Sequence, residues 1–155
     1  MSVYDLPIDP YFICEPDPNN PGWATWDLRD SGRYNDFLGP VSVRRIGDGP
    51  AEVRMFLEKK HSNMGNVAHG GTTMGFIDCA IFGGTRLLGV NMEGPTVTLD
   101  MQTQFVGAGM IDMELIAEVE LVRETRSLIF VRGEVIQEGR HKVAAFSAII
   151  KRTAR

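Results

Sequence analysis

The sequence predicts an α+β domain in which an antiparallel sheet of five to six strands wraps around one long central helix. Residues 69–89 are nearly free of charge, bounded by glycines and apolar all round, as in a helix that is buried on most sides. Alternating apolar and polar residues precede and follow this segment, as in strands with one buried face. The order is two strands, one helix and four strands, and a sheet curled around the helix satisfies both patterns.

The composition fits one folded domain of 155 residues, 43% of them hydrophobic. The net charge of −4 gives no general nucleic-acid footprint, and no apolar stretch reaches the ~18 residues of a membrane span. The first ten residues lack the basic and apolar regions of a signal peptide. Cys14 and Cys79 show neither a metal-ligand spacing nor a disulfide framework. We expect a cytoplasmic protein with no metal, no cofactor, and no nucleic-acid or membrane partner.

Residues 1–38 are predicted to form an irregular N-terminal strap, and residues 39–155 the folded domain. Five of the eight prolines fall within the first 21 positions, where they interrupt regular ladders. A free tail is normally poor in aromatic residues, so the strap is expected to pack on the domain, with a short helix around residues 32–38. The strap holds both tryptophans and all three tyrosines: Trp23, Trp26, Tyr4, Tyr11 and Tyr34.

The regular elements follow in order. Residues 41–46 and 51–58 flank a Gly-Asp-Gly-Pro turn and form a predicted hairpin. The helix of residues 69–89 contains three interior glycines, each costing about 1 kcal/mol relative to alanine, which indicates close approach of the sheet. Residues 95–151 are expected to form four strands joined as a meander. The glycines in the helix are Gly75, Gly83 and Gly84.

Asp78 is the first candidate for chemistry. It lies in the middle of the helix between Ile77 and Cys79, and an aspartate in apolar surroundings is costly unless it is paired. A carboxylate in such a place is a candidate catalytic base. The alternative is that Asp78 faces a local wet edge or caps a backbone group.

The second candidate is His69-Gly70-Gly71, which begins the helix. Free backbone N–H groups and the positive end of the helix dipole meet there, and they suit an oxyanion that develops on a carbonyl group. The alternative is an ordinary glycine-rich turn in which His69 is structural.

The spacing of these two candidates restricts how they can cooperate. Gly70 and Asp78 are eight residues apart, or about 12 Å along a helix. A base and an oxyanion donor must both lie within ~3 Å of the reacting centre. If both act, Gly70 of one subunit must meet Asp78 of another, so we expect a homodimer with shared sites.

These residues carry a family resemblance. The pattern Asn63-x5-His69-Gly70-Gly71-x6-Asp78 resembles the signature of hotdog-fold acyl-CoA thioesterases of the phenylacetate-degradation type. Residues 96–101 are similar to the strand that follows the helix in that family. The resemblance extends over roughly residues 40–151, and it implies a hotdog thioesterase-like domain.

The resemblance also implies roles for individual residues. Asp78 would be the general base or the nucleophile, and the Gly70 N–H would polarise the thioester carbonyl. Asn63 would orient the water or the thioester. Further contacts to the substrate would come from His69, Gly71 and Thr98. Thr98 is equally well read as an ordinary β-strand threonine, and His69 as a residue that shapes the loop.

Coenzyme A would bring several negative charges to the site. Residues 123–142 carry a local charge of +2, with five basic and three acidic side chains. Within this window the turn residues Arg123 and Arg126 are the better phosphate candidates. For each residue singly, a solvated surface charge is the simpler interpretation.

The predicted function is therefore hydrolysis of an acyl-CoA or aryl-acyl-CoA thioester to free acid and thiol by a dimer or tetramer. One alternative is a non-catalytic acyl-CoA-binding module. Another is a hotdog-type hydratase or dehydratase, although His69 would lie about 13 Å from Asp78 along the helix. We further hypothesise that Trp23, Trp26 and Tyr34 lie near the acyl pocket or the dimer interface.

Overall fold

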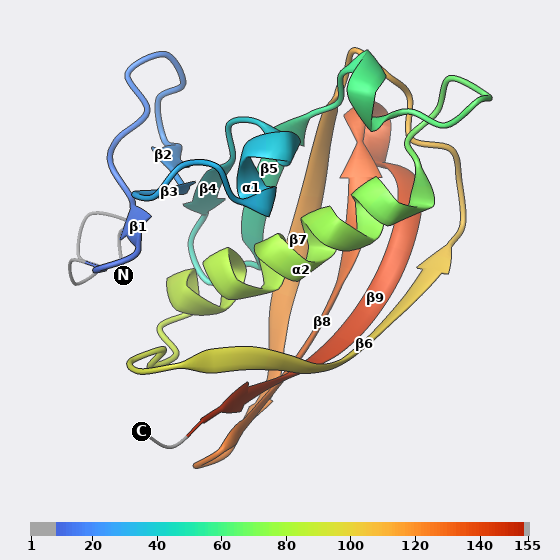
Figure 1. Cartoon of the computed structure of the whole chain (residues 1–155). Helices are drawn as coiled ribbons and strands as arrows, with labels where there is room; N and C mark the ends of the chain where they lie inside the picture. The colour runs from blue at the N-terminus through green and yellow to red at the C-terminus, as the bar shows by residue number, and fades with distance from the viewer. Residues whose placement is uncertain (1–8, 154–155) are drawn as a thin grey trace.

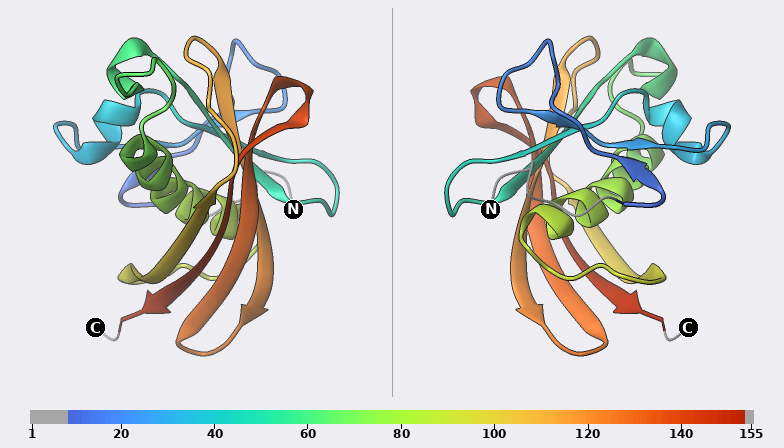
Figure 2. Two further views of the ribbon diagram at one scale, coloured as in Figure 1. Left: turned by 90° about the vertical axis from the view of Figure 1, so that its right-hand side faces the viewer. Right: turned by 90° about the vertical axis from the view of Figure 1, so that its left-hand side faces the viewer.

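The computed structural model describes residues 9–153, and it confirms the α+β prediction. The long helix α2 (Gly70–Leu87) lies across the inner face of a curved antiparallel sheet (Figure 1). Figure 2 shows the strands curving past the helix, which lies on one side of the sheet. No helix within residues 9–153 is long and apolar enough to cross a bilayer.

The sheet has seven strands in the order β2-β4-β5-β7-β8-β9-β6, and all neighbours are antiparallel. Six of them are the predicted strands, and the seventh, β2, comes from the N-terminal strap. The strands are β2 (Ala24–Thr25), β4 (Ser42–Arg45), β5 (Ala51–Phe56), β6 (Thr96–Phe105), β7 (Glu114–Glu124), β8 (Leu128–Gln137) and β9 (His141–Arg152). Two short 3-10 helices, η2 (Lys59–His61) and η3 (Glu138–Arg140), lie between them.

The prediction of a four-stranded meander after the helix is wrong. β7, β8 and β9 do follow one another, but β6 pairs with β9 at the far edge and β7 pairs with β5. The cause is the connection over residues 106–113, which is not a tight turn. The Gly107 N–H donates to the Val143 carbonyl at 3.2 Å, and the Gly109 carbonyl accepts from the Ala68 N–H at 2.8 Å. These bonds carry the chain across the end of the sheet.

The core lies between α2 and the inner face of the sheet. Phe76, Ile77 and Ile81 of α2 are fully buried, and the helix contacts β5 and β7 most extensively. The alternation predicted for β7 places Leu115, Ala117 and Val119 in the core. This alternation ends at Leu121, which is 37% exposed, where the register between β7 and β8 shifts before Arg123.

Two of the three helix glycines have the predicted role of allowing close approach. A Cβ on Gly84 would lie 2.7 Å from the Val119 Cβ of β7. One on Gly83 would lie 3.2 Å from the Trp26 Nε1 of the strap and 3.3 Å from the Val43 Cγ1 of β4. Gly75 differs, because it faces the strap rather than the sheet.

Gly84→Ala is expected to destabilise the fold, by about 1–3 kcal/mol for an overpacked core. The gain in helix propensity from alanine, about 1 kcal/mol, offsets part of this cost. Urea unfolding at matched protein concentrations measures the effect. Gly70→Ala is the control, since its Cβ would meet only Phe105 at an ordinary 3.4 Å. A Gly84→Ala protein more stable than wild type contradicts the close approach of α2 and β7.

The strap runs along the sheet edge and α2, and its first eight residues lie outside the described ones. β1 (Phe12–Ile13) pairs with β3 (Asp27–Leu28), and α1 (Tyr34–Leu38) is the predicted short helix. Trp23 and Trp26 are 5% and 4% exposed. Trp26 stacks on Phe12 with ring centroids 4.4 Å apart. The Trp23 ring lies against the guanidinium groups of Arg44 and Arg54, at 4.3 and 4.1 Å.

Candidate active site

Asp78 is half-buried on the side of α2 that faces the edge strand β6. The Thr98 Oγ1–H donates a hydrogen bond of 2.6 Å to the Asp78 Oδ1. The register between β6 and β9 shifts between Thr98 and Asp100, and such a bulge re-aims the neighbouring side chains. The structure thus brings together two of the residues singled out in the sequence, a carboxylate and a hydroxyl that orients it.

Cys79 adjoins Asp78 but is a poor nucleophile. Burial, and secondarily the Asp78 charge, raises the pKa of the Cys79 thiol to about 12. The Asn35 side-chain amide donates to the Cys79 Sγ at 3.5 Å. The thiol is therefore protonated at neutral pH, which leaves Asp78 as the candidate for chemistry in this helix turn.

Alkylation of Cys79 by iodoacetamide at pH 8 is expected to be about a thousandfold slower than that of an ordinary thiol, since the thiolate is the reactive form. Mass spectrometry of a Cys14→Ser protein isolates the Cys79 rate. Alkylation at the rate of the urea-unfolded protein contradicts the burial of this thiol.

Among the described residues, two backbone N–H groups at the start of α2 have no acceptor, those of Gly70 and Thr72. His69 is the N-cap, and its Nδ1 accepts from the Gly71 N–H at 2.9 Å. The Gly70 N–H is in the first helical position, where no intrahelical acceptor exists, and it has no acceptor within the described part of the chain. The Gly71 N–H is held by the imidazole. Of the two donors without an acceptor, Gly70 is the more exposed, since Thr72 is buried.

Asn63 shapes the loop before the helix. Its Oδ1 accepts from the Gly65 N–H at 2.8 Å and from the Val67 N–H at 3.5 Å. An open cavity of about 750 Å³ lies against this loop. The structure brings Asn63 and His69 together at this cavity, which is lined by Ser62, Asn63, Met64, Gly65 and His69.

His61 is a buried residue that the sequence reasoning missed. Its Nδ1 accepts from the Glu58 N–H at 2.9 Å, and its Nε2–H donates to the Phe37 carbonyl at 2.8 Å. Its own carbonyl accepts from the His69 N–H at 2.8 Å and from the Thr72 hydroxyl at 3.2 Å. His61 therefore ties the strap to the start of α2. The Glu58-x-x-His61 spacing, that of a capping box, is the signal that could have found it.

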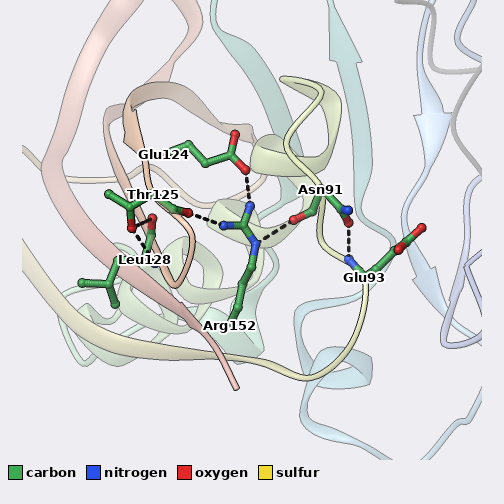
Figure 3. Close-up of polar contacts among 6 residues, drawn as sticks. All are labelled: Asn91, Glu93, Glu124, Thr125, Leu128 and Arg152. Carbon is green, nitrogen blue, oxygen red and sulfur yellow. Dashed lines mark hydrogen bonds and ion pairs between the residues drawn. The ribbon is translucent and has the colours of Figure 1, made fainter. Parts of the chain in front are cut away.

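Arg126 lies elsewhere, in the turn between β7 and β8. It lines an open cavity of about 530 Å³ together with Asn91, which follows the C-terminal end of α2. Figure 3 shows how Arg152 organises this region: it donates to the Asn91 carbonyl at 3.0 Å, to the Thr125 carbonyl at 2.7 Å and to the Glu124 carboxylate. The Arg152 guanidinium is therefore occupied by hydrogen bonds within the protein, whereas the Arg126 side chain is exposed to solvent.

Within one chain these groups remain apart. The continuous helix from Gly70 to Leu87 spans about 25 Å and keeps Gly70 roughly 12 Å from Asp78. Three locations follow: Asp78 with Thr98 in the middle of the helix, Gly70 with Asn63 and His69 at its start, and Arg126 beyond its end.

The same fold occurs in solved structures. The Escherichia coli PaaI protein from the phenylacetic acid degradation operon is 19% identical with a TM-score of 0.62, covering 72% of this chain and 82% of that one. A hypothetical thioesterase with coenzyme A from Streptococcus pneumoniae TIGR4 is 19% identical with a TM-score of 0.65, covering 79% and 98%. Zebrafish thioesterase superfamily member 2 is 22% identical with a TM-score of 0.63, covering 80% and 89%.

A search of the curated proteins finds no match. Residues 65–144, just over half of the chain, match the family model described as the thioesterase superfamily. The matched segment includes Gly70, Asp78 and Thr98, and the fold agrees with it. The chain belongs to the thioesterase superfamily and has its hotdog fold.

Proposed function

We propose that the protein is an acyl-CoA thioesterase that hydrolyses an acyl or aryl-acyl thioester to free acid and thiol. The observation that carries the proposal is the half-buried Asp78, with its Oδ1 held by the Thr98 hydroxyl at 2.6 Å. Membership of the thioesterase superfamily supports thioester chemistry. The Streptococcus pneumoniae structure, which includes coenzyme A, supports the thiol component.

In the proposed reaction Asp78 acts as a general base. It takes a proton from water while the water oxygen bonds to the thioester carbonyl carbon. The Gly70 N–H of a second subunit stabilises the oxyanion, because it lies unpaired at the positive end of the helix dipole. Collapse breaks the carbon–sulfur bond, and the leaving thiolate takes the proton from Asp78. In the alternative course the Asp78 carboxylate bonds to the carbonyl carbon, the carbon–sulfur bond breaks, and the thiolate leaves. Water then hydrolyses the resulting mixed anhydride to the free acid and Asp78.

A second copy of the chain supplies Gly70, because one continuous helix cannot bring Gly70 and Asp78 to the same carbonyl. β6 ends the sheet, and its outer edge pairs with no strand in the described residues. Long free edges normally acquire a partner or protection. Half-exposed apolar side chains follow this edge, namely Val97, Leu99, Phe105 and Val106. We propose a homodimer with β6 at its interface, free to pair further into a tetramer.

The phosphates of coenzyme A would be bound by Arg126, whose exposed guanidinium makes no ion pair among the described residues. Arg126 lies beyond the C-terminal end of α2. With the partner's Gly70 at Asp78, antiparallel pairing of the two helices would carry this end about 13 Å past the start of the partner's helix, toward the loop that precedes it. Asn63, His69 and Gly71 would then shape the loop against which the thioester lies.

A panel of alkyl- and aryl-acyl-CoAs, followed by thiol release, tests the proposal. Saturable hydrolysis of at least one member is expected. Tight acyl-CoA binding without thiol release would instead indicate a binding module. Addition of water to an enoyl-CoA without thiol release would indicate a hydratase.

A further inference from the structure

Tyr34 of the strap reaches the same face of α2 as Asp78. A Cβ built on Gly75 would lie 1.9 Å from the Tyr34 hydroxyl oxygen and 2.8 Å from its Cζ. The tyrosine therefore occupies the space that a side chain at Gly75 would fill. This contact accounts for a glycine in the helix interior, which costs about 1 kcal/mol relative to alanine.

The contact is one helical turn from the proposed base. Positions 75 and 78 are three residues apart and so share a helix face. Because Cα–Cβ bonds tilt toward the helix N-terminus, the Asp78 side chain leans over the turn that Tyr34 covers. Burial, with the neighbouring Cys79 and Asp78 charges, raises the pKa of Tyr34, in keeping with this proximity.

The short helix α1 holds Tyr34 in place through contacts on three sides. Leu38 is 1% exposed, the Asn35 amide bonds to the Cys79 sulfur, and the Phe37 carbonyl accepts from the buried His61. The Tyr34 ring is nevertheless 53% exposed, with its centroid 6.1 Å from that of Phe37. A fixed but half-exposed aromatic side chain thus lies beside the carboxylate.

Two further half-exposed apolar side chains lie close by, Phe37 next to the Tyr34 ring and Met74 one helical turn before Asp78. Phe37 is 39% exposed, and Met74, next to Gly75 on α2, is 38% exposed. These three side chains form an apolar wall at the proposed base. The tryptophans do not share it, since Trp23 and Trp26 are buried in the packing of the strap on the domain.

We propose that Tyr34 is a specificity-determining residue that limits the length of the acyl group bound at Asp78. This inference rests on the proposed function, since it assigns the acyl side of that same site. The Tyr34 ring blocks the helix face beyond Asp78, so short or aryl acyl groups fit against it and long alkyl chains do not. Gly75 is its necessary counterpart, because any side chain there would displace the ring.

The test compares wild type with Tyr34→Ala, Tyr34→Phe and Gly75→Ala, using butanoyl-CoA and dodecanoyl-CoA. Tyr34→Ala is expected to raise the dodecanoyl-to-butanoyl ratio of kcat/KM at least tenfold, the scale of discrimination by apolar pockets. Gly75→Ala should move the ratio in the same direction, and the double variant should add little, because both changes remove one obstruction. Tyr34→Phe, which keeps the ring, should leave the ratio near wild type. Tyr11→Ala is the matched control in the strap, with an exposed tyrosine.

A ratio unchanged by Tyr34→Ala, or changed equally by Tyr11→Ala, overturns the proposal. Thermal melting of each variant separates selectivity from loss of fold. If wild type releases no thiol from any acyl-CoA, the proposed hydrolysis fails. In that case the ratio of the dissociation constants of dodecanoyl-CoA and butanoyl-CoA, compared between wild type and Tyr34→Ala, tests whether Tyr34 limits the acyl length. Failure of both acyl-CoAs to bind contradicts the acyl site as well.

Discussion

Asp78→Asn is expected to lower kcat for thioester hydrolysis by about 10²–10⁴-fold, the usual contribution of a general base. Asparagine has nearly the same shape, and its oxygen can still accept the Thr98 hydroxyl, which lies 2.6 Å from the carboxylate in the native protein. It cannot accept a proton from water or attack the carbonyl as a carboxylate does. The binding of acyl-CoA should therefore survive while thiol release is lost. Steady-state thiol release and calorimetric binding measure the two effects.

The matched control for this variant is Asp48→Asn, which makes the same change in an exposed residue of the turn between β4 and β5. It should hydrolyse acyl-CoA as wild type does. Near-normal turnover by Asp78→Asn would show that the Asp78 carboxylate takes no part in the mechanism. In wild type, a single turnover in ¹⁸O-labelled water separates the two courses. A general base leaves all label in the released acid, so label in the Asp78 carboxylate identifies a nucleophilic course in which water attacks the Asp78 carbonyl of the anhydride.

Gly70→Pro is expected to lower kcat by about 10²–10³-fold, the cost of losing one oxyanion donor. Proline removes the N–H, and it is well suited to the first position of a helix. The preceding residue, His69, already has φ −65° and ψ 137°, the extended conformation that a residue before proline requires. The helix should therefore form normally, and only the donor is lost. The measurements are thiol release for kcat and circular dichroism for the helix.

Gly70→Ala is the control for this change, because it keeps the N–H and adds a methyl group in ordinary contact with Phe105, at 3.4 Å. Its kcat should stay within about tenfold of wild type, since no oxyanion donor is removed. Equal activities of the proline and alanine variants would show that the Gly70 N–H does not act on the substrate.

Much of the fold could be predicted because it follows from local patterns. The buried helix and the hairpin before it are defined by neighbouring residues, and the glycines at positions 83 and 84 indicated close packing on the sheet. The placement of β6 could not be predicted in this way. It depends on hydrogen bonds from residues 106–113 to segments distant in sequence, and a Gly-rich stretch there resembles an ordinary turn.

The residues of the candidate site also divide into those that local sequence patterns predict and those that depend on contacts distant in sequence. Asp78 could be predicted as a candidate because a carboxylate in an apolar helix is costly unless it is paired. Its distance from Gly70 follows from helix geometry alone. His61 and the contact of Tyr34 with Gly75 were missed, because each joins the strap to the domain across a long sequence separation. Trp23 and Trp26 are buried where the strap packs on the domain, and their place near an acyl pocket or a dimer interface stays a prediction.

The central claim is that each site takes Asp78 from one subunit and Gly70 from the other. Asp78→Asn and Gly70→Pro chains, carrying different affinity tags, can be co-expressed and the mixed dimer isolated by two successive purifications. One of its two sites then holds both changes, and the other holds neither. The mixed dimer is expected to regain about half of the wild-type activity per dimer, the share of one intact site in two, although each parent dimer is nearly inactive. Activity no higher than that of the parents would contradict the shared site.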